Sequence, residues 1–149
     1  MVMVLDVVTT LCIGLLIGTE FAVSVFINPV LRKLEDGAQA QAIRLFARRL
    51  GTAMPFWYAA CLLLLIAGAV LRRQESGEGL LIAACAIWAA VILATILVLV
   101  PINNRMMLLD GKAFSVEAQR EHRRWDRLHR VRVGALTAAA VCFLVAVGV

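Results

Sequence analysis

A single carboxylate lies well inside an apolar, membrane-length segment near the start of this sequence. Between residues 2 and 27 the only charged residues are Asp6, close to the beginning, and Glu20. A charged side chain in a membrane-spanning helix is costly, rarely faces lipid, and marks either a functional site or a buried pair with a cation. Glu20 is therefore the first candidate for acid–base chemistry, with a structural pair to an arginine as the alternative.

A second group of chemically useful side chains follows at helical spacing near the C-terminus. Offsets of three, four and three residues place four of them on one helix face: His122, Trp125, His129 and Arg132. His129 and Arg132 come just before the last apolar run, so they either reach toward lipid headgroups or point into the protein. Pointing inward, Arg132 would supply the counter-charge for Glu20, and His129 would exchange a proton near neutral pH.

Asparagines end two of the apolar runs, and an aromatic cluster begins another. Glu20 precedes Asn28 by eight residues, roughly 12 Å along a helix, which puts the carboxylate partway into the membrane. Trp57 lies in a Pro-Phe-Trp-Tyr segment that suits either an interfacial aromatic belt or the mouth of a pocket for a flat ligand. The catalytic candidates are Glu20, His129 and Arg132, and the substrate-binding candidates are Asn28, Asn103, Trp125 and Trp57.

Other charges around His129 have simpler expected roles. Asp126 and Arg130 are four residues apart, so we expect a solvated ion pair on another face of the same helix. Arg124, Arg127 and Arg130 are expected to meet lipid phosphate or water.

Four membrane-spanning helices must position these residues. The 149-residue chain is 62% hydrophobic, whereas about half of a soluble domain is apolar. The excess forms long runs at residues 2–27, 52–71, 80–100 and 133–149, each long enough to cross a bilayer. We expect the first helix to stop at Asn28-Pro29, the third to close at Pro101, and the fourth to begin earlier, in the charged segment before it. The fold class is all-α: a four-helix integral membrane bundle forming one domain over residues 1–149.

Charge distribution predicts the topology. The connections at residues 29–51 and 101–132 carry thirteen of the fifteen lysines and arginines, and with four spans both lie on one side. Positive charge favours the cytoplasmic side. We therefore expect amphipathic helical connections in the cytoplasm, both termini outside it, and a location in a bacterial inner membrane.

Two function classes are disfavoured by composition. The net charge of +5 lies beside membrane segments, where it sets topology and meets anionic lipid, so nucleic-acid binding is not expected. The four cysteines fall one in each apolar run without a Cys-x-x-Cys pair, which argues against thiol-oxidising four-helix membrane proteins.

The polar positions together resemble a known family. The pattern is a Glu inside the first span, Asn-Pro at its end, Pro101-Ile102-Asn103 at the end of the third, and Trp-x-x-x-His-x-x-Arg before the fourth, covering Trp125 to Arg132. This pattern is similar to the anthrone oxygenase-like membrane proteins, formerly a domain of unknown function, over nearly the whole chain. The resemblance implies a small four-helix enzyme that oxidises polyketide anthrones to anthraquinones with molecular oxygen, without a metal or flavin.

The leading hypothesis is therefore a cofactor-independent oxygenase of a lipophilic anthrone-, phenol- or quinol-like compound. The reaction needs a base near neutral pH, for which Glu20 and His129 are candidates, and a cation such as Arg132 to stabilise the resulting anion. Asn28 or Asn103 would orient the substrate carbonyl. Its partners would be this small molecule, molecular oxygen and membrane lipids, and a homo-oligomer is compatible with the sequence.

Two alternatives remain open at this stage. A non-catalytic membrane protein would use the same residues to hold a quinone, lipid or haem-like molecule. A metal-dependent membrane oxidoreductase would use Glu20, His129 and His122 as ligands. No cofactor is expected, and a metal or haem is not excluded. The metal alternative ranks third, because His122 and His129 are seven residues apart, roughly 10 Å along a helix, and these two alone cannot chelate one ion.

Overall fold

The computed structural model describes residues 2–107 and 116–148. The middle of the second basic connection, residues 108–115 with Lys112, lies outside the described residues, as do residues 1 and 149. The expectation that this connection contains amphipathic helix can therefore be compared with the structure only on its two flanks.

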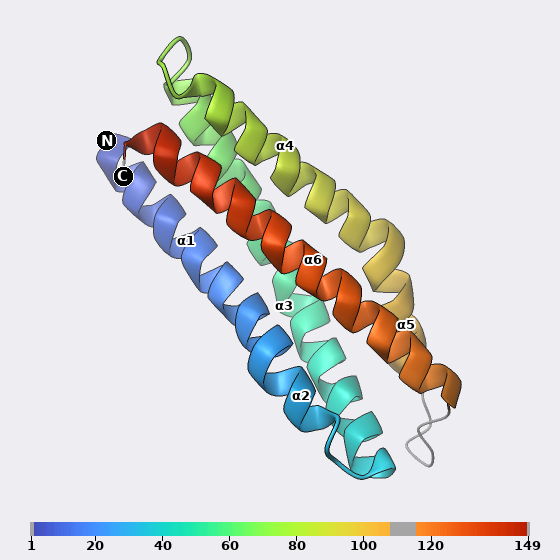
Figure 1. Cartoon of the computed structure of the whole chain (residues 1–149). Helices are drawn as coiled ribbons and strands as arrows, with labels where there is room; N and C mark the ends of the chain where they lie inside the picture. The colour runs from blue at the N-terminus through green and yellow to red at the C-terminus, as the bar shows by residue number, and fades with distance from the viewer. Residues whose placement is uncertain (1, 108–115, 149) are drawn as a thin grey trace.

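The described chain is a bundle of long helices, which confirms the expected all-α fold (Figure 1). The first rod consists of α1 (Val2–Ala22), η1 (Val23–Ile27) and α2 (Asn28–Leu31), and the second is α3 (Asp36–Leu71). The third consists of α4 (Glu78–Ala94), η2 (Thr95–Leu99) and α5 (Val100–Met107), and the fourth is α6 (Val116–Val147). Within the described residues, four helices are long and apolar enough to cross a membrane.

The first and third rods do not end at their prolines, contrary to the expectation from sequence. Each instead contains one π-helical segment, in which a backbone N–H donates to the carbonyl five residues earlier. In η1 the N–H of Asn28 donates to the carbonyl of Val23, and in η2 the N–H of Val100 donates to the carbonyl of Thr95. Pro29 and Pro101 each take the second position of the α-helix that follows. A proline is tolerated there because the first-turn N–H groups have no partner in the helix. The rods therefore continue to Leu31 and Met107.

The second and fourth rods begin well before their apolar runs. α3 starts at Asp36 rather than near residue 52, and α6 starts at Val116 rather than near residue 133. The early start of α6 was expected. The amphipathic parts of both basic connections are thus N-terminal extensions of the spanning helices themselves, so the side chains on them are held rigidly to the bundle.

Two buried apolar clusters lie toward opposite ends of the bundle. One packs the half that contains both termini, around Leu16, Leu65, Trp88, Leu136 and Phe143. The other packs the end that carries the α2–α3 turn, and comprises Leu31, Ala40, Ile43, Ile102 and Met106. N and C are drawn at one end of the bundle and this turn at the other (Figure 1). Between the two clusters the interior is partly hollow, and the buried polar side chains of Glu20 and His129 lie there.

An ion pair ties the first two rods together at the end with the termini. Arg72, directly after α3, donates to both carboxylate oxygens of Asp6 at 2.9 and 2.5 Å. This hydrogen bonding raises the pKa of the Arg72 guanidinium above its usual value. The guanidinium therefore stays charged, and the bidentate pair fixes α3 against α1 far along the bundle from Glu20.

Candidate active site

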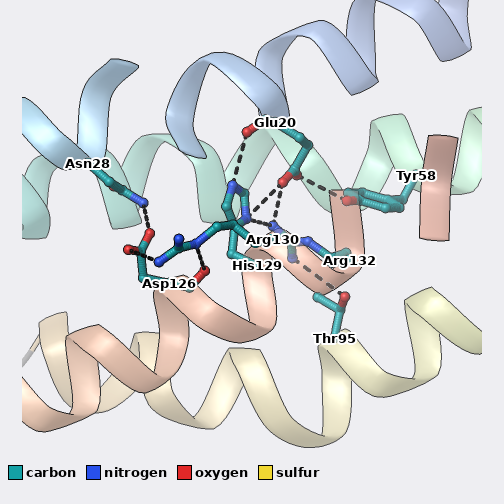
Figure 2. A network of polar contacts seen from close by, with 8 residues as sticks. All are labelled: Glu20, Asn28, Tyr58, Thr95, Asp126, His129, Arg130 and Arg132. Carbon is teal, nitrogen blue, oxygen red and sulfur yellow. Dashed lines mark hydrogen bonds and ion pairs between the residues drawn. The ribbon is translucent and has the colours of Figure 1, made fainter. Parts of the chain in front are cut away.

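Glu20 lies near the end of α1 with 3% of its surface exposed, and three other side chains converge on it (Figure 2). Arg132 Nη2 is 2.6 Å from its Oε2 atom and His129 Nδ1 is 3.1 Å from the same oxygen. The hydroxyl of Tyr58 donates to the other oxygen, Oε1, at 3.0 Å. The structure thus turns Glu20, His129 and Arg132 into the bundle interior, rather than toward lipid headgroups.

The hydrogen bonds of His129 define its proton positions. Nε2 lies 3.0 Å from the backbone oxygen of Glu20, which can only accept, so Nε2 carries the hydrogen. Nδ1 lies 2.8 Å from Arg132 Nη2 and therefore accepts from the guanidinium when the ring is neutral. If a proton is added at Nδ1, it faces Glu20 Oε2 at 3.1 Å. His129 and Glu20 can thus share one additional proton between two buried atoms.

Arg132 is held from several directions, and one of its donors is unpaired within the part of the chain described. Its Nη1 approaches Thr95 Oγ1 at 3.5 Å, and its guanidinium carbon lies 5.7 Å from the centre of the Tyr58 ring. The attraction of a cation for the face of an aromatic ring adds to this positioning. Its Nε–H is buried and has no hydrogen-bond partner among the described residues.

These residues line a cavity of about 270 Å³ between the two apolar clusters. That size is close to the lower end of the range that holds drug-sized ligands, about 300–1,000 Å³. Most of the wall is apolar. The structure brings six of the seven candidate residues from the sequence to this one cavity, namely Glu20, Asn28, Asn103, Trp125, His129 and Arg132.

Trp57, the seventh candidate, is placed elsewhere. Its indole N–H donates to the backbone oxygen of Cys12 at 3.1 Å, and its ring packs against the apolar cluster near the termini. It is not among the residues that line the cavity. The substrate-binding role predicted for Trp57 is therefore corrected to a packing role, and the neighbouring Tyr58 contributes to the cavity wall instead.

The expected face of α6 forms an aromatic column. The rings of His122 and Trp125 are nearly parallel at 6.2 Å, and those of Trp125 and His129 at 4.7 Å. All three line the cavity. Because the faces of these rings are turned toward one another, a flat ligand lying along this wall would meet their edges and reach the Glu20 carboxylate at its inner end.

Asp126 is not the solvated residue that its spacing with Arg130 suggests. It is 1% exposed, and its Oδ1 accepts from the Asn28 side-chain amide at 2.7 Å. Oδ2 lies 3.1 Å from Arg32 and 3.2 Å from Arg130. This network ties α6 to α2 (Figure 2 shows Asn28, Asp126 and Arg130). Asn28 therefore lines the cavity with its amide N–H₂ already engaged.

Asn103 differs from Asn28 in that its side chain makes no hydrogen bond to another described residue. It stands next to Gly51 of α3, where a Cβ atom would lie 3.6 Å from the Asn103 nitrogen. Asn103 is thus the better placed of the two asparagines to orient a ligand oxygen.

Within residues 2–107 and 116–148, no group of three His, Cys, Asp or Glu side chains lies close enough together to hold a metal ion. Glu20 and His129 approach each other, but the third position next to them is occupied by a guanidinium and a phenol. The metal-dependent alternative from the sequence has no three-ligand set in the part of the chain described.

The fold defines a small protein with four helices able to span a membrane and a buried cluster of ionisable side chains at the wall of a mostly apolar cavity. A family model described as anthrone oxygenase matches residues 42–142, more than half of the chain, so the chain belongs to the anthrone oxygenase family. The matched segment contains Tyr58, Asn103, His129 and Arg132, while Glu20 and Asn28 precede it. No match was found to a curated protein or to a solved structure.

Proposed function

We propose that the protein is an oxygenase that converts a lipophilic anthrone-, phenol- or quinol-like compound with molecular oxygen. The observation that carries this proposal is the buried network of Glu20, His129, Arg132 and Tyr58 at the wall of an apolar cavity. Family membership supports the same reaction class. The substrate and the catalytic roles below are parts of the proposal.

In the first proposed step, the Glu20–His129 pair removes a proton from the methylene carbon that lies across the central ring from the substrate carbonyl and is acidified by conjugation with it. A positioned base of this kind contributes about 10²–10⁴-fold to rate. The proton is held between Glu20 Oε2 and His129 Nδ1, which lie 3.1 Å apart. The neighbouring aromatic wall of Trp125 would keep the ring system in plane with these atoms.

The anion formed in this step needs a nearby cation and hydrogen-bond donors. Arg132 supplies the charge for the developing enolate or phenolate oxygen, because its side chain lines the cavity beside Glu20. Donors that are already oriented in a site that excludes water stabilise such charge without reorganisation. Asn103 would hold a second oxygen of the substrate.

The electron-rich anion then reacts with oxygen without further help from an electron carrier. One electron passes to oxygen, the two radicals combine in a carbon–oxygen bond, and the peroxide takes up a proton. Loss of the second proton from the same carbon breaks the oxygen–oxygen bond and releases water. A methylene group and one O₂ thus give a carbonyl group and H₂O. The substrate supplies all four electrons, so the proposed reaction requires no metal, haem or flavin.

Oxygen consumption by purified protein tests the function. With anthrone dissolved in the lipid of a reconstituted sample, we expect one O₂ consumed for each anthraquinone formed, without accumulation of hydrogen peroxide. The rate should exceed spontaneous oxidation, measured with heat-denatured protein. Binding of anthrone without oxygen uptake would support the non-catalytic binding protein instead.

We further propose that both termini lie outside the cytoplasm of a bacterial cell, with the protein in the inner membrane. The α2–α3 turn lies at the opposite end of the bundle from the termini, and the basic residues are concentrated in the two connections. An alkaline phosphatase reporter fused to the C-terminus should be active, and a fluorescent reporter that folds only in the cytoplasm should stay dark. The reverse result would overturn this orientation.

A further inference from the structure

Some of the residues that line the cavity are also exposed on the outer surface of the bundle. Phe46, Ile96 and Val100 have 41%, 57% and 40% of their surface exposed, and Gly51, Pro55 and Ala59 are exposed as well. All six side chains are apolar. They come from only two places, the middle of α3 and the η2–α5 segment, which pack against each other.

Among the described residues, the rest of the cavity wall is buried or only partly exposed. At the end with the α2–α3 turn, the lining residues Leu31, Ile43 and Met106 belong to the buried apolar cluster there. On the α1 and α6 side, Glu20 and His129 are at most 3% exposed. The exposed part of the wall is therefore confined to one side, between α3 and η2–α5.

The exposed stripe on α3 consists of small side chains at regular helical spacing. Gly51, Pro55 and Ala59 are four residues apart, so they share one face and extend over roughly 12 Å of the helix. Ala59 follows Tyr58, whose hydroxyl contacts Glu20. The stripe thus reaches from the level of Asn103, next to Gly51, to the level of the carboxylate.

Building on the proposed function, we infer that substrate reaches the site sideways from the bilayer, through an opening between α3 and η2–α5. The rim residues Pro55, Ala59 and Ile96 lie inside the apolar runs at residues 52–71 and 80–100 of helices that are long and apolar enough to span a membrane. This part of the rim therefore faces acyl chains rather than water. The occupant of this opening is a small apolar compound dissolved in the lipid. With the proposed orientation, the opening lies in the cytoplasmic half of the membrane.

A bilayer-confined photolabel tests this route without depending on catalysis. An uncharged trifluoromethylphenyl diazirine, dissolved in the lipid of reconstituted wild-type protein, should label Glu20 and His129 when illuminated, although both are buried. The variant Ala59→Phe/Ile96→Phe places two large side chains on the rim, and we expect labelling of Glu20 and His129 to fall at least tenfold. Peptide mass spectrometry quantifies both sites.

A matched control uses the adjacent lipid-facing positions. Ala60 and Leu97 are exposed and neighbour Ala59 and Ile96, but neither lines the cavity. The variant Ala60→Phe/Leu97→Phe should therefore be labelled like wild type. Equal labelling of the rim variant and wild type, or an equal loss in both variants, would overturn the lateral route.

A second label keeps the inference testable if the rim variant does not fold. The same diazirine carrying a sulfonate group stays in water, and in wild-type protein it should leave Glu20 and His129 unlabelled. Labelling of these residues by the water-confined probe as strongly as by the apolar probe would mean an aqueous route. If the labelling is as expected but the protein consumes no oxygen, the lateral opening is supported and the oxygenase function is refuted.

Discussion

Glu20→Gln will lower the turnover of anthrone by about a hundredfold or more, because glutamine keeps the size of the side chain and its acceptor oxygen but not its basicity. The same change leaves the Arg132 guanidinium, 12% exposed, without its counter-charge. Removing one partner of a buried ion pair costs about 3–5 kcal/mol. Oxygen uptake per folded molecule, measured beside the melting temperature, records both effects.

The double variant Glu20→Gln/Arg132→Met separates catalysis from structural pairing. Replacing the arginine with an apolar side chain removes the uncompensated charge, so the melting temperature should recover. Turnover should not recover, because both the base and the stabilising cation are gone. A double variant that regains turnover together with stability would show that Glu20 and Arg132 only hold the helices together.

Asp126→Asn is the matched control for Glu20→Gln. Asp126 is also a buried carboxylate with arginine partners, but it bonds to Asn28 and does not line the cavity. Asparagine at this position should lower the melting temperature and leave oxygen uptake per folded molecule within about twofold of wild type, since no proposed step uses it. A hundredfold loss would place Asp126 in the reacting network.

Arg132→Lys will also reduce turnover, by about 10²–10³-fold, although the positive charge is kept. Nη2 of Arg132 contacts both Glu20 Oε2 and His129 Nδ1, and the side chain lines the cavity. A lysine ammonium is a point charge on a flexible stem and cannot reproduce this planar arrangement. A loss of turnover of this size is typical when an enzyme loses one oriented hydrogen-bond donor to a developing anion.

Arg130→Lys on the same helix provides the comparison for Arg132→Lys. The Arg130 side chain is 60% exposed and pairs with Asp126 from outside the cavity. Exposed ion pairs contribute little to stability, so oxygen uptake should change by less than about twofold. An equal loss in both variants would attribute the Arg132 effect to general disturbance of α6.

The sequence was most informative where charge interrupts an apolar run. Glu20 stands alone in such a run, and this isolation alone predicts a buried partner. The offsets between His122, Trp125, His129 and Arg132 also predicted a shared face, because α6 is regular over this stretch. In the structure Glu20 has a buried partner in Arg132, and the four residues on α6 all line the same cavity. Catalytic function remains a proposal.

Sequence could not distinguish Trp57 from Tyr58, because a membrane helix is apolar on every face and gives no inside–outside pattern. Which aromatic residue faces Glu20 depends on the rotation of α3, and this is set by packing against the other helices. The burial of Asp126 was missed for a related reason. Asp126 and Arg130 are four residues apart on one helix, a spacing that is typical of an exposed ion pair. Its burial depends on Asn28, 98 residues away in the sequence.

The π-helical segments have a consequence for the rotational register of the first and third rods. Glu20 and Asn28 are eight residues apart, which in an uninterrupted α-helix puts them about 80° apart around the axis. A π turn accommodates about one extra residue, so the two side chains behave as if seven residues apart and come within about 20° of each other. Thr95 and Asn103 have the same separation across η2, and both line the cavity. Each π turn therefore has the same effect on helix rotation as one inserted residue. In a relative that lacked the turn, the two side chains of a pair would face the cavity together only if they were seven residues apart instead of eight.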